Sequence, residues 1–134
     1  MQKPNDSKQQ CMPKYVSHLL GKKWVLPILE ELAYEKDGIG FISLFERLKF
    51  ITPREASLLL SQLVETGIVN KKNIKGSKNS KYSITELGME FYRTLEKIKG
   101  LSSMAYEDSK GVNCSKTRCI ECRYYARDYA GQKR

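Results

Sequence analysis

The spacing of apolar residues in the first part of the chain predicts two short helices. Residues 16–20 form a brief apolar pattern that Gly21 interrupts, and residues 24–32 place apolar side chains at the intervals of one buried helix face. Pro27 falls in the first turn of the second helix, where a missing N–H costs little. Residues 1–10 are polar and lack periodicity, so we expect a disordered arm there and two helices that meet at Gly21.

Two capping signals predict the next pair of helices. We expect a loop over residues 34–40, followed by Ser43 as an N-cap with a glutamate three residues later, which is a capping box. The same device recurs in the letters TPRE, where Thr52 would cap a helix over residues 53–66 and a proline would fill its first position. Gly67 is then the natural residue to end that helix.

After Gly67 the pattern changes from helical to alternating. Residues 68–69 begin a predicted strand, Gly76 and Asn79 mark a turn, and Tyr82 with the isoleucine two residues later alternates as a returning strand. A long helix should follow from about Glu86 to Gly100 or somewhat beyond. Its apolar stripe consists of Leu87, Phe91, Leu95 and Ile98.

Two closely spaced helices followed by a hairpin predict a winged helix-turn-helix. The expected fold class is α+β, mainly helical, with a two-stranded wing and a long C-terminal helix. We expect one DNA-binding domain over residues 11–108, to which the family resemblance described below adds dimerisation, and a cysteine-bearing extension over 109–134. The recognition helix would be residues 53–66, with Ala56, Leu60 and Leu63 facing inward. The side chains expected to face outward are Arg54, Ser57, Leu58, Ser61 and Gln62.

The charge distribution indicates what kind of partner the chain binds. The chain has a formal net charge of +9, and residues 70–82 contain five lysines and no acidic residue. A basic excess favours a nucleic-acid partner first, and an acidic membrane or acidic protein second. A lysine-rich hairpin is often only a solvated loop, but on a wing it can neutralise phosphates. The lysines expected to do so are Lys71, Lys72, Lys75, Lys78 and Lys81.

Four stretches together resemble the HxlR-type winged-helix regulators, a MarR-like group of bacterial and archaeal DNA-binding proteins. They are CMPKYVSHLLGKKW, FISLFERLKF, TPREASLLLSQLVETGIV and KYSITELG, and the resemblance runs from Cys11 to about Gly100. It implies transcriptional control, a homodimer built by the N-terminal and final helices, and recognition helices in successive major grooves. It also implies a redox-reactive cysteine at Cys11. The chain departs from the family pattern at Leu58 and Leu59, where relatives often carry arginine, and in its cysteine-bearing tail.

The tail places three cysteines in a C-x4-C-x2-C spacing, at Cys114, Cys119 and Cys122. This spacing suits zinc, and it equals the first three ligands of a plant-type [2Fe–2S] cluster. A fourth ligand would be Cys11, His18 or a thiol of a partner chain. A redox dithiol pair, or reduced thiols in a short amphipathic extension, are the alternatives.

Cys11 has two interpretations of its own. A cysteine at a helix start is often a small buried residue. The same position, with Lys14 nearby, would also favour the reactive thiolate.

These features lead to two functional hypotheses. The first is a sequence-specific regulator that binds double-stranded DNA and is controlled by thiol or metal state. The residues expected to touch base edges or phosphates are Thr52, Arg54, Ser57, Ser61 and Gln62. The second is a protein-interaction module in which Leu58 and Leu59 form an apolar docking patch.

Other functional classes are disfavoured by what the sequence lacks. A single histidine, with no nucleophile motif and no glycine-rich phosphate loop, argues against an enzyme, and no small-molecule substrate is evident. No apolar run approaches the roughly 18 residues of a spanning helix. The polar first residues do not resemble a signal peptide, so we expect a cytoplasmic protein without a membrane partner.

Overall fold

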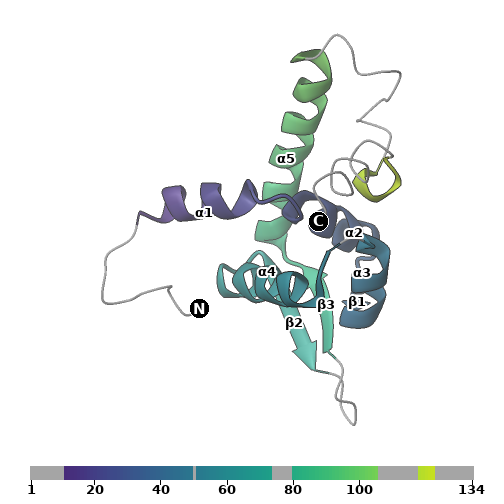
Figure 1. Ribbon diagram of the computed structural model, residues 1–134. Coiled ribbons are helices and arrows are strands. Elements are labelled where there is room, and N and C mark those ends of the chain that lie inside the picture. Colours follow the sequence, from purple (N-terminus) through teal and green to yellow (C-terminus); the bar gives the residue numbers. More distant parts are fainter. Residues whose placement is uncertain (1–10, 50, 74–79, 106–117, 123–134) are drawn as a thin grey trace.

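The structure is a computed structural model that describes residues 11–49, 51–73, 80–105 and 118–122. The predicted arm over residues 1–10, the turn at Gly76 and Asn79, and most of the predicted extension lie outside these residues. Figure 1 shows a central body from which α1 and the far end of α5 project. The elements are α1 (Met12–Leu20), α2 (Val25–Tyr34), β1 (Ile39–Gly40), α3 (Phe41–Leu48), α4 (Pro53–Glu65), β2 (Val69–Asn73), β3 (Ser80–Ile84), α5 (Glu86–Ala105) and the 3₁₀ helix η1 (Cys119–Glu121).

The two N-terminal helices confirm the prediction from the apolar spacing. Gly21 follows the last residue of α1, and its N–H donates to the carbonyl of Ser17 at 3.1 Å. The helices do not meet there, because α2 begins only at Val25. Trp24 stands directly before α2 and is 2% exposed, so it anchors this junction in the core.

The start of α3 corrects two predictions. The helix begins at Phe41 with Gly40 as its N-cap, so Ser43 lies inside the helix and the Ser43 capping box is wrong. The expected loop over residues 34–40 also contains β1, in which Ile39 pairs with Tyr82 of β3. Because its partner strand lies some forty residues further along the chain, a strand of two residues leaves no local periodicity to detect.

The helix predicted over residues 53–66 is confirmed as α4, which spans Pro53–Glu65 with Thr66 as its C-cap. The Thr52 hydroxyl oxygen accepts a hydrogen bond from the Glu55 N–H at 3.1 Å, which satisfies one of the free donors at the helix start. Gly67 follows the helix with a φ of +81°, a conformation that favours glycine. The inward positions are buried as predicted, at Ala56, Leu60 and Leu63.

The wing and the last helix are held together by a close backbone approach. The antiparallel sheet has the strand order β1-β3-β2, with Val69 opposite Ile84. Just after β3, the Thr85 hydroxyl donates to the Gly67 carbonyl at 2.7 Å and accepts from the Gly88 N–H at 2.9 Å. A Cβ on Gly88 would lie 2.2 Å from the carbonyl oxygen of Ile68, so the first turn of α5 packs directly on the start of β2.

One continuous core lies between α2, α3, α4 and the sheet. The apolar stripe of α5 belongs to this core only in part, because Leu87 is 50% exposed and Ile98 is 53% exposed. No helix among the described residues is long and apolar enough to cross a membrane. In the single chain, the outer half of α5 presents apolar side chains to solvent, at Ile98 and Leu101.

Candidate nucleic-acid interface

The outward face of α4 carries the polar residues expected to approach DNA. Thr52, Arg54, Ser57 and Ser61 are exposed. Gln62 differs from the prediction, because it is only partly exposed and its Oε1 is buried with no hydrogen-bond partner among the described residues. The exposed polar face is therefore concentrated in the first two and a half turns of the helix.

The two leucines of α4 have different environments. Leu59 is 5% exposed and belongs to the core, whereas Leu58 is 55% exposed. The expected docking patch of two leucines is therefore wrong, since only Leu58 is available at the surface. It lines a small cavity of about 280 Å³ between α4 and the segment that joins α1 to α2. Lys22 and Lys23 of that segment line the same cavity and bring positive charge to this side of α4.

The wing places lysines on both faces of the hairpin. Lys72 of β2 lies directly opposite Lys81 of β3, and both are exposed. Lys71 is on the other face, with its Nζ 6.0 Å from the centre of the Tyr82 ring. Lys75 and Lys78 lie outside the described residues. Like charges directly opposite one another destabilise a strand pair, so the Lys72 and Lys81 pair disfavours the isolated hairpin and is suited to an anionic partner.

The recognition helix and the wing form one connected unit. Only residues 66–68 separate the end of α4 from the start of β2. The Thr66 hydroxyl donates to the Leu63 carbonyl at 3.0 Å, and the Thr85 hydroxyl donates to the Gly67 carbonyl at 2.7 Å. In Figure 1 α4 lies across the base of the β2–β3 hairpin. The side chains of α4 and the wing are consequently held at a fixed spacing.

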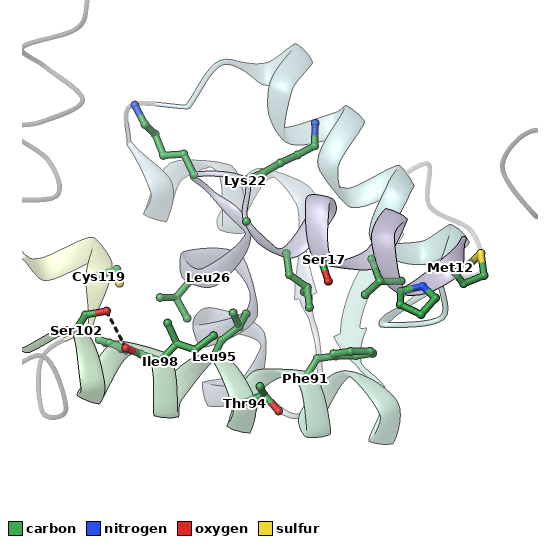
Figure 2. Close-up of a pocket in the computed structure, with 16 residues that line it drawn as sticks. Met12, Ser17, Lys22, Leu26, Phe91, Thr94, Leu95, Ile98, Ser102 and Cys119 are labelled. Carbon is green, nitrogen blue, oxygen red and sulfur yellow. Dashed lines mark hydrogen bonds between the residues drawn. The ribbon is translucent and has the colours of Figure 1, made fainter. Parts of the chain in front are cut away.

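A large apolar groove runs between α1 and α5. Its volume is about 1010 Å³, and its walls are mainly apolar side chains such as Val16 and Leu20 of α1 and Leu95 of α5. Figure 2 shows Phe91, Leu95 and Ile98 along one side of the groove, with Met12 at one end and Cys119 at the other. Beyond the groove, Leu101 is 62% exposed. This is the face that the resemblance assigns to dimerisation.

The cysteines do not come together as one site among the described residues. Cys11 directly precedes α1 and is exposed, so its interpretation as a buried residue is wrong. His18 is also exposed on α1. Cys119 is 8% exposed, Cys122 is half-buried, and Cys114 lies outside the described residues. In the part of the chain that the structure describes, no group of three metal-ligating side chains is arranged to hold an ion.

An acidic pair inside α2 was not anticipated from the sequence. Glu30 and Glu31 are 2% and 0% exposed, and both are paired with cations from other elements. The available signal was the position of two glutamates next to the apolar stripe of residues 24–32. Their cationic partners could not be identified in that way, because they lie far away in the sequence.

Comparison with known proteins gives one family model and several solved structures with the same fold. The family model for the HxlR-like helix-turn-helix matches residues 19–110. A structure from Thermoplasma volcanium, described as a possible HxlR family transcriptional factor, is 22% identical with a TM-score of 0.58, and the match covers 76% of this chain and 85% of that one. The reduced form of the transcriptional regulator YodB from B. subtilis is 19% identical with a TM-score of 0.61, covering 78% of this chain and 100% of the other. A comparison with curated protein sequences gives no significant match.

Proposed function

The chain belongs to the HxlR-like helix-turn-helix family, and from this premise we propose that it is a homodimeric regulator that binds specific double-stranded DNA sequences. The fold is that of HxlR-family transcription regulators. The observation that carries the proposal is the pair of exposed lysines, Lys72 and Lys81, that face each other across the wing. This arrangement is unfavourable in isolation and becomes favourable beside phosphate oxygens.

Base recognition is assigned to the first turns of α4. Arg54, Ser57 and Ser61 are exposed along one face, and arginine and serine side chains can hydrogen-bond both base edges and phosphates. Leu58 lies on the same exposed face and is suited to the methyl group of a thymine. Because α4 and the wing are connected within a few residues, a helix in the major groove would bring the wing lysines to the adjacent backbone.

A second copy of the chain is the proposed occupant of the groove between α1 and α5. Ile98 and Leu101 are more than half exposed on the outer part of α5, and such a continuous apolar helix face is typical of a dimer interface. A symmetric dimer would also present two α4 helices to two half-sites of a palindromic operator.

Regulation through Cys11 is proposed as a further property of this dimer. Cys11 is exposed at the N-terminal end of α1, and the adjacent Met12 lines the groove. Oxidation of this thiol would therefore change a side chain at the edge of the proposed dimer interface.

The proposal is tested by measuring affinity for duplex DNA as a function of salt. Operator sequences would first be selected from a random duplex pool, and dissociation constants would then be determined by fluorescence anisotropy. We expect log Kobs to fall linearly with log salt, with a slope of about −0.9 for each phosphate neutralised. Absence of selected sequences, or an affinity that is independent of salt, would contradict the proposal.

The exposed Leu58 favours one alternative, a winged helix that docks on another protein. Its side chain is 55% exposed where a base-reading residue is expected. The variant Leu58→Arg separates the two functions, because its added cation should strengthen phosphate binding by more than the lost thymine-methyl contact weakens it, whereas the same charge should disrupt an apolar protein contact. Tighter duplex binding without loss of a bound protein partner would support the DNA-binding function. Loss of such a partner would support the alternative.

A further inference from the structure

The carboxylates of Glu30 and Glu31 lie in an unfavourable part of α2. Both are buried, with side-chain exposures of 3% and 0%, and they stand in the second half of a helix that ends at Tyr34. The negative end of the helix dipole disfavours acidic groups there, and a buried carboxylate is costly unless it is paired. The stability of α2 therefore depends on the cations that other segments supply.

Those cations come from three separate segments. Arg47 of α3 donates to Glu31 Oε1 at 3.1 Å. The Nη1 atom of Arg118 donates to both carboxylate oxygens of Glu31 at 3.2 Å. Lys99 of α5 pairs with Glu30. Residues 118–122 therefore supply one of the two arginines that neutralise the fully buried carboxylate.

The segment around Arg118 is recognised by more than charge. The guanidinium carbon of Arg118 lies 4.4 Å from the centre of the Tyr34 ring, a distance typical of a cation–π contact. The next residue, Cys119, donates its backbone N–H to Glu30 Oε1 at 2.9 Å. Glu31 and the Tyr34 ring together hold the guanidinium, and Glu30 accepts the main-chain N–H of the next residue. Such an arrangement can bind an extended peptide that contains arginine.

We propose that Glu30, Glu31 and Tyr34 form a binding site for an arginine-containing peptide, and that the chain's own residues 118–122 occupy it as a removable latch that covers the Cys119 thiol. The contact is small. It combines the polar contacts above with burial of Cys119 and packing of Ile120 against the core, and the Arg118 and Glu121 side chains remain 28% and 58% exposed. A short segment held in this way opens at a much lower free energy than the whole domain unfolds.

The latch controls the chemistry of one thiol. Cys119 is 8% exposed while the segment is docked. Burial, together with the nearby Glu30 carboxylate, raises the pKa of the Cys119 thiol to about 12, so the covered thiol stays protonated and unreactive at neutral pH. The exposed Cys11 has no such cover. The two cysteines should therefore react in a fixed order, with Cys119 reacting only after the latch opens.

The latch also closes one end of the groove between α1 and α5. Cys119 and Lys99 both line that groove, and Lys99 and the Cys119 N–H bind the same Glu30 carboxylate. Release of residues 118–122 would remove one partner from each of the two buried carboxylates. This inference rests on contacts within one chain and is independent of the proposed DNA binding.

Site-resolved alkylation of the reduced full-length protein tests the latch. The rate at which iodoacetamide modifies each cysteine would be followed by tandem mass spectrometry in the wild type and in Arg118→Gln. Loss of a charge-assisted contact should increase opening and therefore raise the Cys119 rate by about tenfold. The Cys11 rate should stay unchanged, and Arg118→Lys should give an intermediate Cys119 rate because it keeps the charge but loses the Nη2 contact with Glu121 and the planar guanidinium over the Tyr34 ring.

The matched control is Arg47→Gln, which removes the other arginine from the same Glu31 carboxylate. General weakening of α2 would raise the Cys119 rate equally in Arg47→Gln and Arg118→Gln, and this result would overturn the latch. An unchanged Cys119 rate in Arg118→Gln would overturn it as well. A rate increase confined to Arg118→Gln would support it, even if both variants lose similar thermal stability.

Discussion

At the scale of single residues, the structure depends on Gly88 because two backbones meet there. The space for a Cβ is already occupied by the Ile68 carbonyl oxygen at 2.2 Å and by the Ile84 side chain at 2.7 Å. Backbone atoms cannot move aside as a flexible side chain can. A methyl group at this position must therefore push α5 away from the start of β2.

Gly88→Ala is expected to lower the free energy of unfolding by about 2 kcal/mol, because the cost of overpacking exceeds the gain in helix propensity. Urea unfolding followed by circular dichroism would measure the change. Gly21→Ala is the matched control, since a Cβ there would lie 3.4 Å from its nearest neighbour, the Ser17 carbonyl oxygen. Equal stabilities of the two variants would contradict this account.

The two capping signals in the sequence give a second prediction at this scale. Thr52→Ala removes the hydroxyl that accepts from the Glu55 N–H and should cost about 1 kcal/mol of stability. Ser43→Ala should cost little, because Ser43 is exposed inside α3 and Gly40 is the N-cap. Thermal unfolding of both variants would check the difference. A larger loss for Ser43→Ala would show that α3 begins at Ser43.

At the scale of elements, local patterns identified every long helix and the wing. The Thr52 cap, the Gly67 terminator and the alternation after it are all local signals, and each was correctly interpreted. The Ser43 cap is a local signal that was wrong, because α3 already begins at Phe41. The other failures are nonlocal. The strand β1 exists only because Ile39 meets Tyr82, and the burial of Leu59 rather than Leu58 depends on which neighbours cover α4. Spacing within a helix cannot supply that information.

In the candidate site too, local features could be predicted from the sequence and contacts between distant residues could not. The lysine-rich wing was evident from composition, but the direct opposition of Lys72 and Lys81 required the strand register. The shared site of the tail cysteines stays a prediction, because Cys114 lies outside the described residues. The contact of the Cys119 N–H with Glu30, which lies 89 residues earlier in the chain, could not be predicted from the cysteine spacing. Contacts over such separations are decided by packing, and ligand spacing does not reveal them.

The wing gives a prediction in which stability and affinity change in opposite directions. Replacing Lys72 or Lys81 by glutamine removes repulsion between directly opposite charges and should raise stability by about 0.5 kcal/mol. The same change removes one phosphate contact and should reduce the magnitude of the salt slope for DNA binding by about 1. Lys97→Gln is the control, because Lys97 is exposed on α5, away from the wing. A wing variant that binds duplex DNA with an unchanged salt slope would rule out this phosphate contact.

At the scale of the whole molecule, the apolar groove between α1 and α5 and the exposed Ile98 and Leu101 of α5 lie away from the wing. The wing and the exposed face of α4 form a polar and basic end, while the groove and the outer half of α5 form an apolar side. Figure 1 shows strands β2 and β3 and the far end of α5 extending in opposite directions from the central body. One chain thus separates a surface suited to nucleic acid from a surface suited to a second copy.

The whole-molecule prediction concerns Ile98 and Leu101 on the outer part of α5. Introducing Ile98→Glu and Leu101→Glu together places two charges in the proposed dimer interface, and burying them without partners should convert the dimer to a monomer. Sedimentation velocity would measure the change in mass. Ile42→Glu is the matched control, because Ile42 is a similarly exposed isoleucine on α3, 58% against 53% for Ile98, and it does not line the groove.

The monomeric variant also separates dimerisation from DNA contact. Each chain keeps its own α4 and wing, so a half-site should still bind with a normal salt slope, while a palindromic operator should lose the gain that comes from linking two half-sites. That gain is commonly on the order of a hundredfold or more in affinity. If the double variant stayed dimeric, or if Ile42→Glu dissociated the dimer equally well, the interface would lie elsewhere on the molecule. If the monomer bound the full operator as tightly as the wild type, two-fold symmetry would have no part in operator recognition.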